Sequence, residues 1–75
     1  MVSVEASDEA IERNNQGVEL LKQGKIEEAI GALQKAVEVN PKDADVQLNL
    51  AYAYDRQGRV DDAIIQYQKA IELNS

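Results

Sequence analysis

The chain has 75 residues, 44% of them hydrophobic but only 4% aromatic, and its formal net charge at pH 7 is −6. A chain of this length forms one small domain with a modest core, which disulfides, a bound metal or self-association often reinforce. Cysteine and histidine are both absent, which excludes disulfides, ordinary zinc sites and catalysis by a thiol or an imidazole. The acidic excess disfavours a nucleic-acid partner, because the phosphate backbone carries the same sign of charge.

The N-terminal sequence MVSVEASDE has neither a basic flank nor an apolar core, so we expect no secretory signal there. No apolar run approaches the roughly 18 residues that a membrane-spanning helix requires. These observations favour a cytoplasmic protein without a membrane partner. We interpret residues 1–9 as a flexible lead-in to the first folded element.

Helix start and stop signals predict four helices, and no segment shows the alternation typical of a strand. Ser7 or Asp8 can cap the first helix and Asp43 the third, because a short polar side chain accepts hydrogen bonds from free backbone amides. Gly24 and Gly58 follow the first and third helices, where a left-handed residue commonly ends a helix. The predicted helices cover about residues 8–23, 26–39, 44–57 and 60–73.

An internal repeat with an offset of 34 residues relates the two halves of the chain. Residues 23–40 (QGKIEEAIGALQKAVEVN) and 57–74 (QGRVDDAIIQYQKAIELN) are identical at nine of these 18 positions. Six further positions exchange similar residues, so chance does not explain the match. We therefore place two copies of one unit at residues 10–43 and 44–75, each a pair of antiparallel helices joined by a short loop.

Residue size follows the same period. Small residues are expected where paired helices approach closely, at Gly17, Ala29, Ala36, Ala51, Ala63 and Ala70. Large residues are expected to fill the remaining core, at Leu20, Leu33, Leu50, Tyr54 and Tyr67. This pattern resembles the tetratricopeptide repeat, a 34-residue helix–turn–helix unit, and Pro41 resembles the proline that closes it.

The resemblance covers about residues 10–75 and implies an all-α fold of two tandem helix–turn–helix hairpins, a short right-handed solenoid fragment of four helices. It also implies a scaffold for protein–protein interaction. Its departures are local: Arg13 and Gln47 stand where the family often has tryptophan, and Gln16 stands where it often has leucine. Ser75 replaces the second proline. We expect these departures to loosen the packing of the first helix.

The residue inventory offers no catalytic centre. The hydroxyl nucleophiles other than tyrosine are Ser3, Ser7 and Ser75, all near the termini and without a base partner. The glycines are isolated and form no phosphate-binding loop. Paired acids at 27–28 and 61–62 point about 100° apart on a helix and are favoured at a helix start, so we interpret them as solvated residues rather than metal ligands. We expect no enzyme, no cofactor and no metal.

The resemblance implies a groove whose inner wall comes from the first helix of each unit. That wall would comprise Asn14, Asn15, Val18, Leu21, Lys22, Leu48, Asn49, Tyr52, Asp55 and Arg56. From the residues alone, Leu48, Tyr52 and Asp55 share a stripe at i, i+4 and i+7, outside the expected hairpin core. Such a surface suits an extended or helical peptide. The alternative is that these residues are ordinary surface, or are covered by neighbouring repeats of a longer array.

We predict peptide or partner contacts at Asn14, Val18, Leu48, Asn49, Tyr52, Asp55 and Arg56. One subtype of the family binds a peptide carboxylate with a clamp of lysines and asparagines. Asn49 matches one member of that clamp, but Asn14 and Val18 stand where a lysine and another asparagine would be. The clamp is therefore not predicted, and the net charge of −6 disfavours acidic tails as ligands.

The last helix suggests a second function. Ile64 and Ile71 correspond to Ile30 and Val37, which we expect the third helix to cover. No helix follows to cover Ile64 and Ile71 in their turn, although repeat arrays commonly end in a polar capping helix. The alternative function is therefore a self-assembly unit, a homo-oligomer formed end to end or by exchange of helices.

Overall fold

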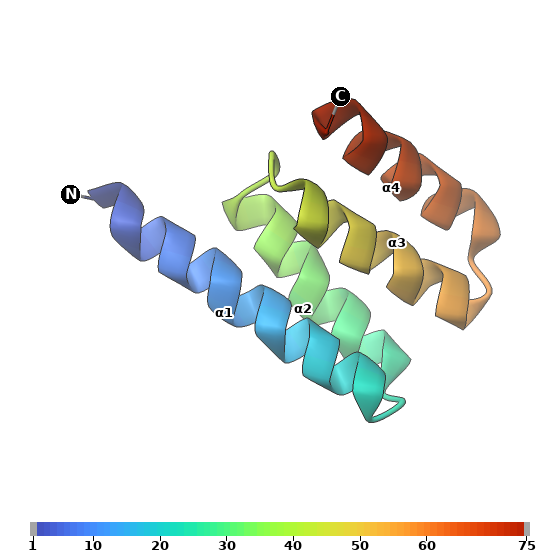
Figure 1. Cartoon of the computed structure of the whole chain (residues 1–75). Coiled ribbons are helices and arrows are strands. Elements are labelled where there is room, and N and C mark those ends of the chain that lie inside the picture. Colours follow the sequence, from blue (N-terminus) through green and yellow to red (C-terminus); the bar gives the residue numbers. More distant parts are fainter. Residues whose placement is uncertain (1, 75) are drawn as a thin grey trace.

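The computed structural model describes residues 2–74, which form four α-helices joined by short turns. The helices lie side by side in chain order, and each runs antiparallel to the one before it (Figure 1). They are α1 (Val2–Lys22), α2 (Ile26–Val39), α3 (Ala44–Gln57) and α4 (Val60–Leu73). The predicted all-α fold of two helix–turn–helix hairpins is confirmed, and the bounds of the last three helices agree with the prediction.

The predicted start of the first helix is wrong. Helix α1 begins at Val2, ahead of the expected caps at Ser7 and Asp8, so residues 2–9 are helical rather than a separate lead-in. No glycine or proline interrupts residues 2–9, and nothing there stops a helix from extending toward the N-terminus. The flexibility of this segment and the division into units at residues 10–43 and 44–75 stay predictions.

The turns within the two hairpins have the same geometry. Gly24 and Gly58 adopt φ angles of 82° and 89°, as their positions after a helix predict. The amide of Gly58 donates to the carbonyl of Asp55 and that of Arg59 to the carbonyl of Tyr54, at 3.0 and 2.9 Å. These bonds satisfy carbonyls that the end of the helix would otherwise leave free.

The turn between the hairpins is held by two side chains. The Asp43 carboxylate accepts hydrogen bonds from the amides of Asp45 and Val46, so the predicted N-cap of α3 is confirmed. Gln47, at a position where we noted a departure from the family pattern, is buried, and its Nε2 donates to the carbonyl of Pro41 at 3.0 Å. A polar side chain thus fastens α3 to the turn that precedes it.

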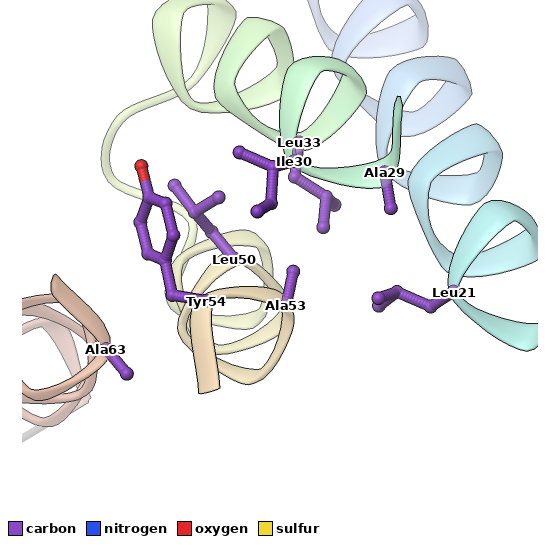
Figure 2. Packing of buried hydrophobic residues seen from close by; sticks show 8 residues of the cluster. All are labelled: Leu21, Ala29, Ile30, Leu33, Leu50, Ala53, Tyr54 and Ala63. Atoms are coloured by element: carbon purple, nitrogen blue, oxygen red, sulfur yellow. The ribbon is translucent and has the colours of Figure 1, made fainter. Parts of the chain in front are cut away.

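Helix α2 is the centre of the core, because both α1 and α3 pack against it. Figure 2 shows the buried cluster that joins the four helices. Its members are Leu21, Ala29, Ile30, Leu33, Leu50, Ala53, Tyr54 and Ala63. The Tyr54 hydroxyl lies at the rim, where it accepts a hydrogen bond from Nε2 of Gln34 at 2.9 Å.

Helices α1 and α2 approach closely at Gly17. Gly17 is buried, and a Cβ atom added to it would lie 2.5 Å from Cγ of Leu33. Leu33 is itself fully enclosed, so it has little room to move aside. The absence of a side chain at Gly17 therefore allows the short distance between α1 and α2.

The four helices, over the residues described, include none that is long and apolar enough to cross a membrane.

We predict that Gly17→Val lowers the free energy of unfolding by about 2 kcal/mol or more, because overpacking a tight core is costly. Gly31→Val is the matched control, since Gly31 lies inside α2 with nothing within 4 Å of an added Cβ. That change is expected to leave stability within about 0.5 kcal/mol, because valine is no worse than glycine in a helix. Urea unfolding of both variants measures the difference, and equal stabilities would contradict the packing described.

Candidate functional site

A hollow of about 240 Å³ lies between α1 and α3. It exists because both helices pack on α2 and make only light contact with each other. Its lining, three residues from each helix, comprises Val18, Leu21, Lys22, Asn49, Tyr52 and Arg56. We call it the α1–α3 hollow.

An asparagine pair holds the two walls together. Nδ2 of Asn49 donates to Oδ1 of Asn14 at 2.9 Å, and both side chains are partly buried. This bond links residues 35 apart in the chain, so it fixes α3 relative to α1 directly. Asn49 keeps one amide hydrogen and its carbonyl oxygen for other partners.

Tyr52 and Arg56 form the outer edge of the hollow on α3. The Tyr52 side chain is 46% exposed, and its hydroxyl accepts a hydrogen bond from Nη1 of Arg56 at 3.2 Å. The guanidinium carbon lies 5.7 Å from the centre of the tyrosine ring, within range of a cation–π interaction. The tyrosine is thus oriented before any ligand arrives.

The lining carries two cations and no carboxylate, so its local charge is opposite to the net charge of −6. Lys22 forms an ion pair with Glu19, at 3.8 Å, and both side chains are well exposed. Such a surface pair contributes little and exchanges readily for a ligand. Arg56 takes part in none of the ion pairs found in the described part of the chain.

The structure brings together most of the predicted site residues. Val18, Asn49, Tyr52 and Arg56 line the hollow, as do Leu21 and Lys22 of the wider predicted wall. Asn14 lies at its edge through the bond to Asn49. Whether these residues bind a ligand stays a prediction.

Leu48 and Asp55 lie away from the α1–α3 hollow. Leu48 lines a separate depression beside α4, together with Ala70 and Ile71, and Asp55 is exposed and lines neither place. Of the predicted stripe of Leu48, Tyr52 and Asp55, only Tyr52 lines the α1–α3 hollow; whether the three residues contact one ligand stays a prediction. Successive helical residues turn by about 100°, so Asn49 and Arg56 face α1, whereas Leu48 turns toward α4.

Asn15, which the resemblance placed in the wall, lies outside the α1–α3 hollow. It lines a polar depression on the outer side of α1, not the hollow. The Asn14–Asn49 bond was not foreseen, because no local pattern predicts a contact between residues so far apart. The Tyr52–Arg56 contact has the i, i+4 spacing of neighbours on a helix and was open to prediction.

The predicted self-association residues lie on α4 and are exposed. Ile64 is 48% and Ile71 is 68% accessible, whereas the corresponding Ile30 is 6% accessible and Val37 packs against the core.

Residues 8–74 contain no group of three or more acidic side chains placed to hold a metal ion.

A family model for the tetratricopeptide repeat matches residues 14–75, from the middle of α1 through α2, α3 and α4. The chain belongs to the tetratricopeptide repeat family. Members of this family generally mediate protein–protein interactions. No curated protein matches the sequence.

We predict that Asn14→Ala lowers the free energy of unfolding by about 1 kcal/mol, because it leaves Asn49 without its partner. Asn15→Ala is the matched control, since Asn15 is the exposed neighbour on the same helix; it is expected to change stability by less than about 0.5 kcal/mol. Urea unfolding, with Asn49→Ala and the double variant to complete the cycle, measures the coupling. Additive losses would show that the two asparagines do not interact.

Proposed function

We propose that this tetratricopeptide repeat chain is a binding module that holds a short segment of a partner protein in the α1–α3 hollow. The observation that carries the proposal is the lining, in which an apolar floor lies beside an exposed tyrosine and two cations with no carboxylate. The chain acts by contact alone, without a cofactor or chemistry of its own.

The size of the hollow favours a peptide over a small molecule. Its volume of about 240 Å³ lies below the roughly 300–1,000 Å³ of small-molecule sites. Val18 and Leu21 form an apolar floor suited to one aliphatic side chain of the ligand. Tyr52 is the anchor on the opposite wall, since a half-exposed, oriented aromatic residue is typical of a binding hot spot.

The charges of the hollow indicate which kind of residue lies next to the aliphatic residue in the ligand. Lys22 and Arg56 flank the floor, so a ligand carboxylate next to the aliphatic residue would gain charge-assisted hydrogen bonds. The net charge of −6 opposes a long acidic tail. A segment with an aliphatic residue and one adjacent acidic residue therefore fits the hollow best. This arrangement, with Lys22 on one wall and Arg56 on the other, differs from the lysine and asparagine clamp of the family subtype.

A second candidate function is self-association through α4. The observation that favours it is the contrast between equivalent positions: Ile30 is buried under α3, whereas Ile64 and Ile71 are exposed on α4. Burying a large aliphatic side chain contributes about 1.5–3 kcal/mol. Self-association leaves the α1–α3 hollow open, so the two functions are compatible.

The α1–α3 hollow can be tested with peptides that are selected from a random library against the wild-type chain and labelled with fluorescein. We predict that Tyr52→Ala weakens their binding tenfold or more, which corresponds to about 1.4 kcal/mol. Leu48→Ala is the matched control, because Leu48 is 47% exposed but lies outside the hollow. Its affinity is expected to equal that of the wild type, as measured by fluorescence polarisation.

Added salt should weaken binding of the selected peptides, and Arg56→Gln should reduce that salt dependence, because exposed charges are screened. The proposal is contradicted if Tyr52→Ala binds the peptides as tightly as the wild type, or if Leu48→Ala weakens binding as much as Tyr52→Ala.

A further inference from the structure

Ile11 is a large aliphatic residue of α1 that lies outside the core. Its side chain is 57% exposed, and it precedes Val18 of the α1–α3 hollow by seven residues. Residues at i and i+7 lie two turns apart on the same side of a helix. Asn14 stands between them and bonds to Asn49 of α3. The inner side of α1 therefore presents two aliphatic residues, one on each side of the asparagine pair.

Helix α3 continues the same surface past the asparagine pair. Four of its residues stand at i, i+4, i+7 and i+11 and so share one side of the helix: Asp45, Asn49, Tyr52 and Arg56. Asp45 is exposed and also borders the depression beside α4. Because α1 and α3 are both antiparallel to α2, they run parallel to each other (Figure 1). Ile11 and Asp45, each one turn before the asparagine pair, thus belong to the same end of the surface.

The two ends of this surface carry opposite charges. Asp45 lies in the first turn of α3, whereas Lys22 and Arg56 lie in the last turns of α1 and α3. Acids are favoured near the start of a helix and bases near its end, so two parallel walls gather each sign at its own end. Asp8, one turn before Ile11, and the Asp43 cap add to the acidic end, where the adjoining turn supplies one base, Lys42.

The spacing of the side chains selects an extended ligand. Seven residues from Ile11 to Val18 correspond to about 10 Å along the helix axis, and eleven from Asp45 to Arg56 to about 16 Å. An extended chain advances about 3.3 Å per residue, so about three of its residues span the first distance and about five the second. The main-chain groups of a helical ligand are already bonded within the helix, which would leave Asn49 without a partner.

We propose that the partner segment is extended and crosses the asparagine pair, with two aliphatic residues about three positions apart. One contacts Val18 and Leu21 in the α1–α3 hollow, and the other contacts Ile11. The remaining amide hydrogen and the carbonyl oxygen of Asn49 bond the main chain between them. This inference rests on the proposed function and deepens it, because it adds a second anchor and a direction of charge.

Charge complementarity specifies the residues that flank the two anchors. An acidic residue next to the first aliphatic residue meets Lys22 and Arg56, and a basic residue next to the second meets Asp45. The ligand class is therefore a segment of about six residues, with an acid at one end, a base at the other and an aliphatic residue inside each. Such a segment has no net charge, which suits a chain of net charge −6 better than an acidic ligand does.

Fluorescence polarisation with the peptides selected from a random library tests the second anchor. Ile11→Ala is expected to weaken binding about fivefold, because it removes a large aliphatic contact. Ile65→Ala is the matched control, since Ile65 is 48% exposed but lies on α4, and it should bind like the wild type. Alanine substitutions along the peptide then identify the residue whose loss is not additive with Ile11→Ala.

That peptide residue reports the conformation of the ligand. We expect it about three positions from the residue that is coupled to Tyr52, as an extended chain requires. A separation of about seven positions would indicate a helical ligand and would overturn the inference.

A reversal of charge tests the acidic end. Asp45→Lys is expected to weaken binding of the selected peptides, and a peptide whose base is replaced by glutamate should bind Asp45→Lys better than it binds the wild type. Asp61→Lys is the matched control, because Asp61 is likewise an exposed acid in the first turn of a helix, but of α4. It changes the net charge equally and should treat both peptides as the wild type does.

The outcomes separate this inference from the proposed function. If Ile11→Ala and Asp45→Lys bind like the wild type while Tyr52→Ala does not, the binding surface ends at the asparagine pair. That result overturns the inference and keeps the proposed function. If Tyr52→Ala also binds like the wild type, or if no peptide is selected, both are overturned.

Sedimentation equilibrium at the assay concentrations completes the experiment, because self-association through α4 would alter the apparent affinities. A mass of 8.3 kDa at every concentration would contradict the second candidate function and leave the peptide measurements as they stand.

Discussion

The close contact of Gly17 with Leu33 is the constraint on which the rest of the structure depends. It brings α1 close against α2, so that α3, which also packs on α2, reaches α1 through the asparagine pair. The α1–α3 hollow is the space that remains where the two helices do not meet. The candidate site is therefore a consequence of how small and large residues alternate in the core.

The two outer helices, α1 and α4, expose side chains of different kinds. The outer side of α1 is polar at Glu12, Gln16 and Glu19, whereas the outer side of α4 is aliphatic at Ile64 and Ile71. The outer surface is thus polar on α1 and aliphatic on α4. The hollow lies on a third surface, so binding a partner segment and pairing through α4 do not compete.

Most of the fold was predictable because its signals are local. The glycines after α1 and α3, the Asp43 cap and the 34-residue period each act over a few residues or by simple repetition, and they located α2, α3 and α4 correctly. The start of α1 was not predicted correctly, since the expected capping residues Ser7 and Asp8 are also compatible with the interior of a longer helix. The residues of the site were predictable only in part. Tyr52 lines the α1–α3 hollow and Leu48 does not, because of the rotation of α3 relative to α1. Tertiary packing sets that rotation, and no local sequence pattern reveals it.

The central claim is that the α1–α3 hollow, and not another surface, receives the partner segment. Titration of a selected peptide into the ¹⁵N-labelled chain, followed by two-dimensional NMR, tests it most directly. We expect the amide signals around Val18, Asn49 and Tyr52 to shift as peptide is added, while those around Ile64 and Ile71 stay in place. Shifts concentrated along α4 or on the outer side of α1 would contradict it.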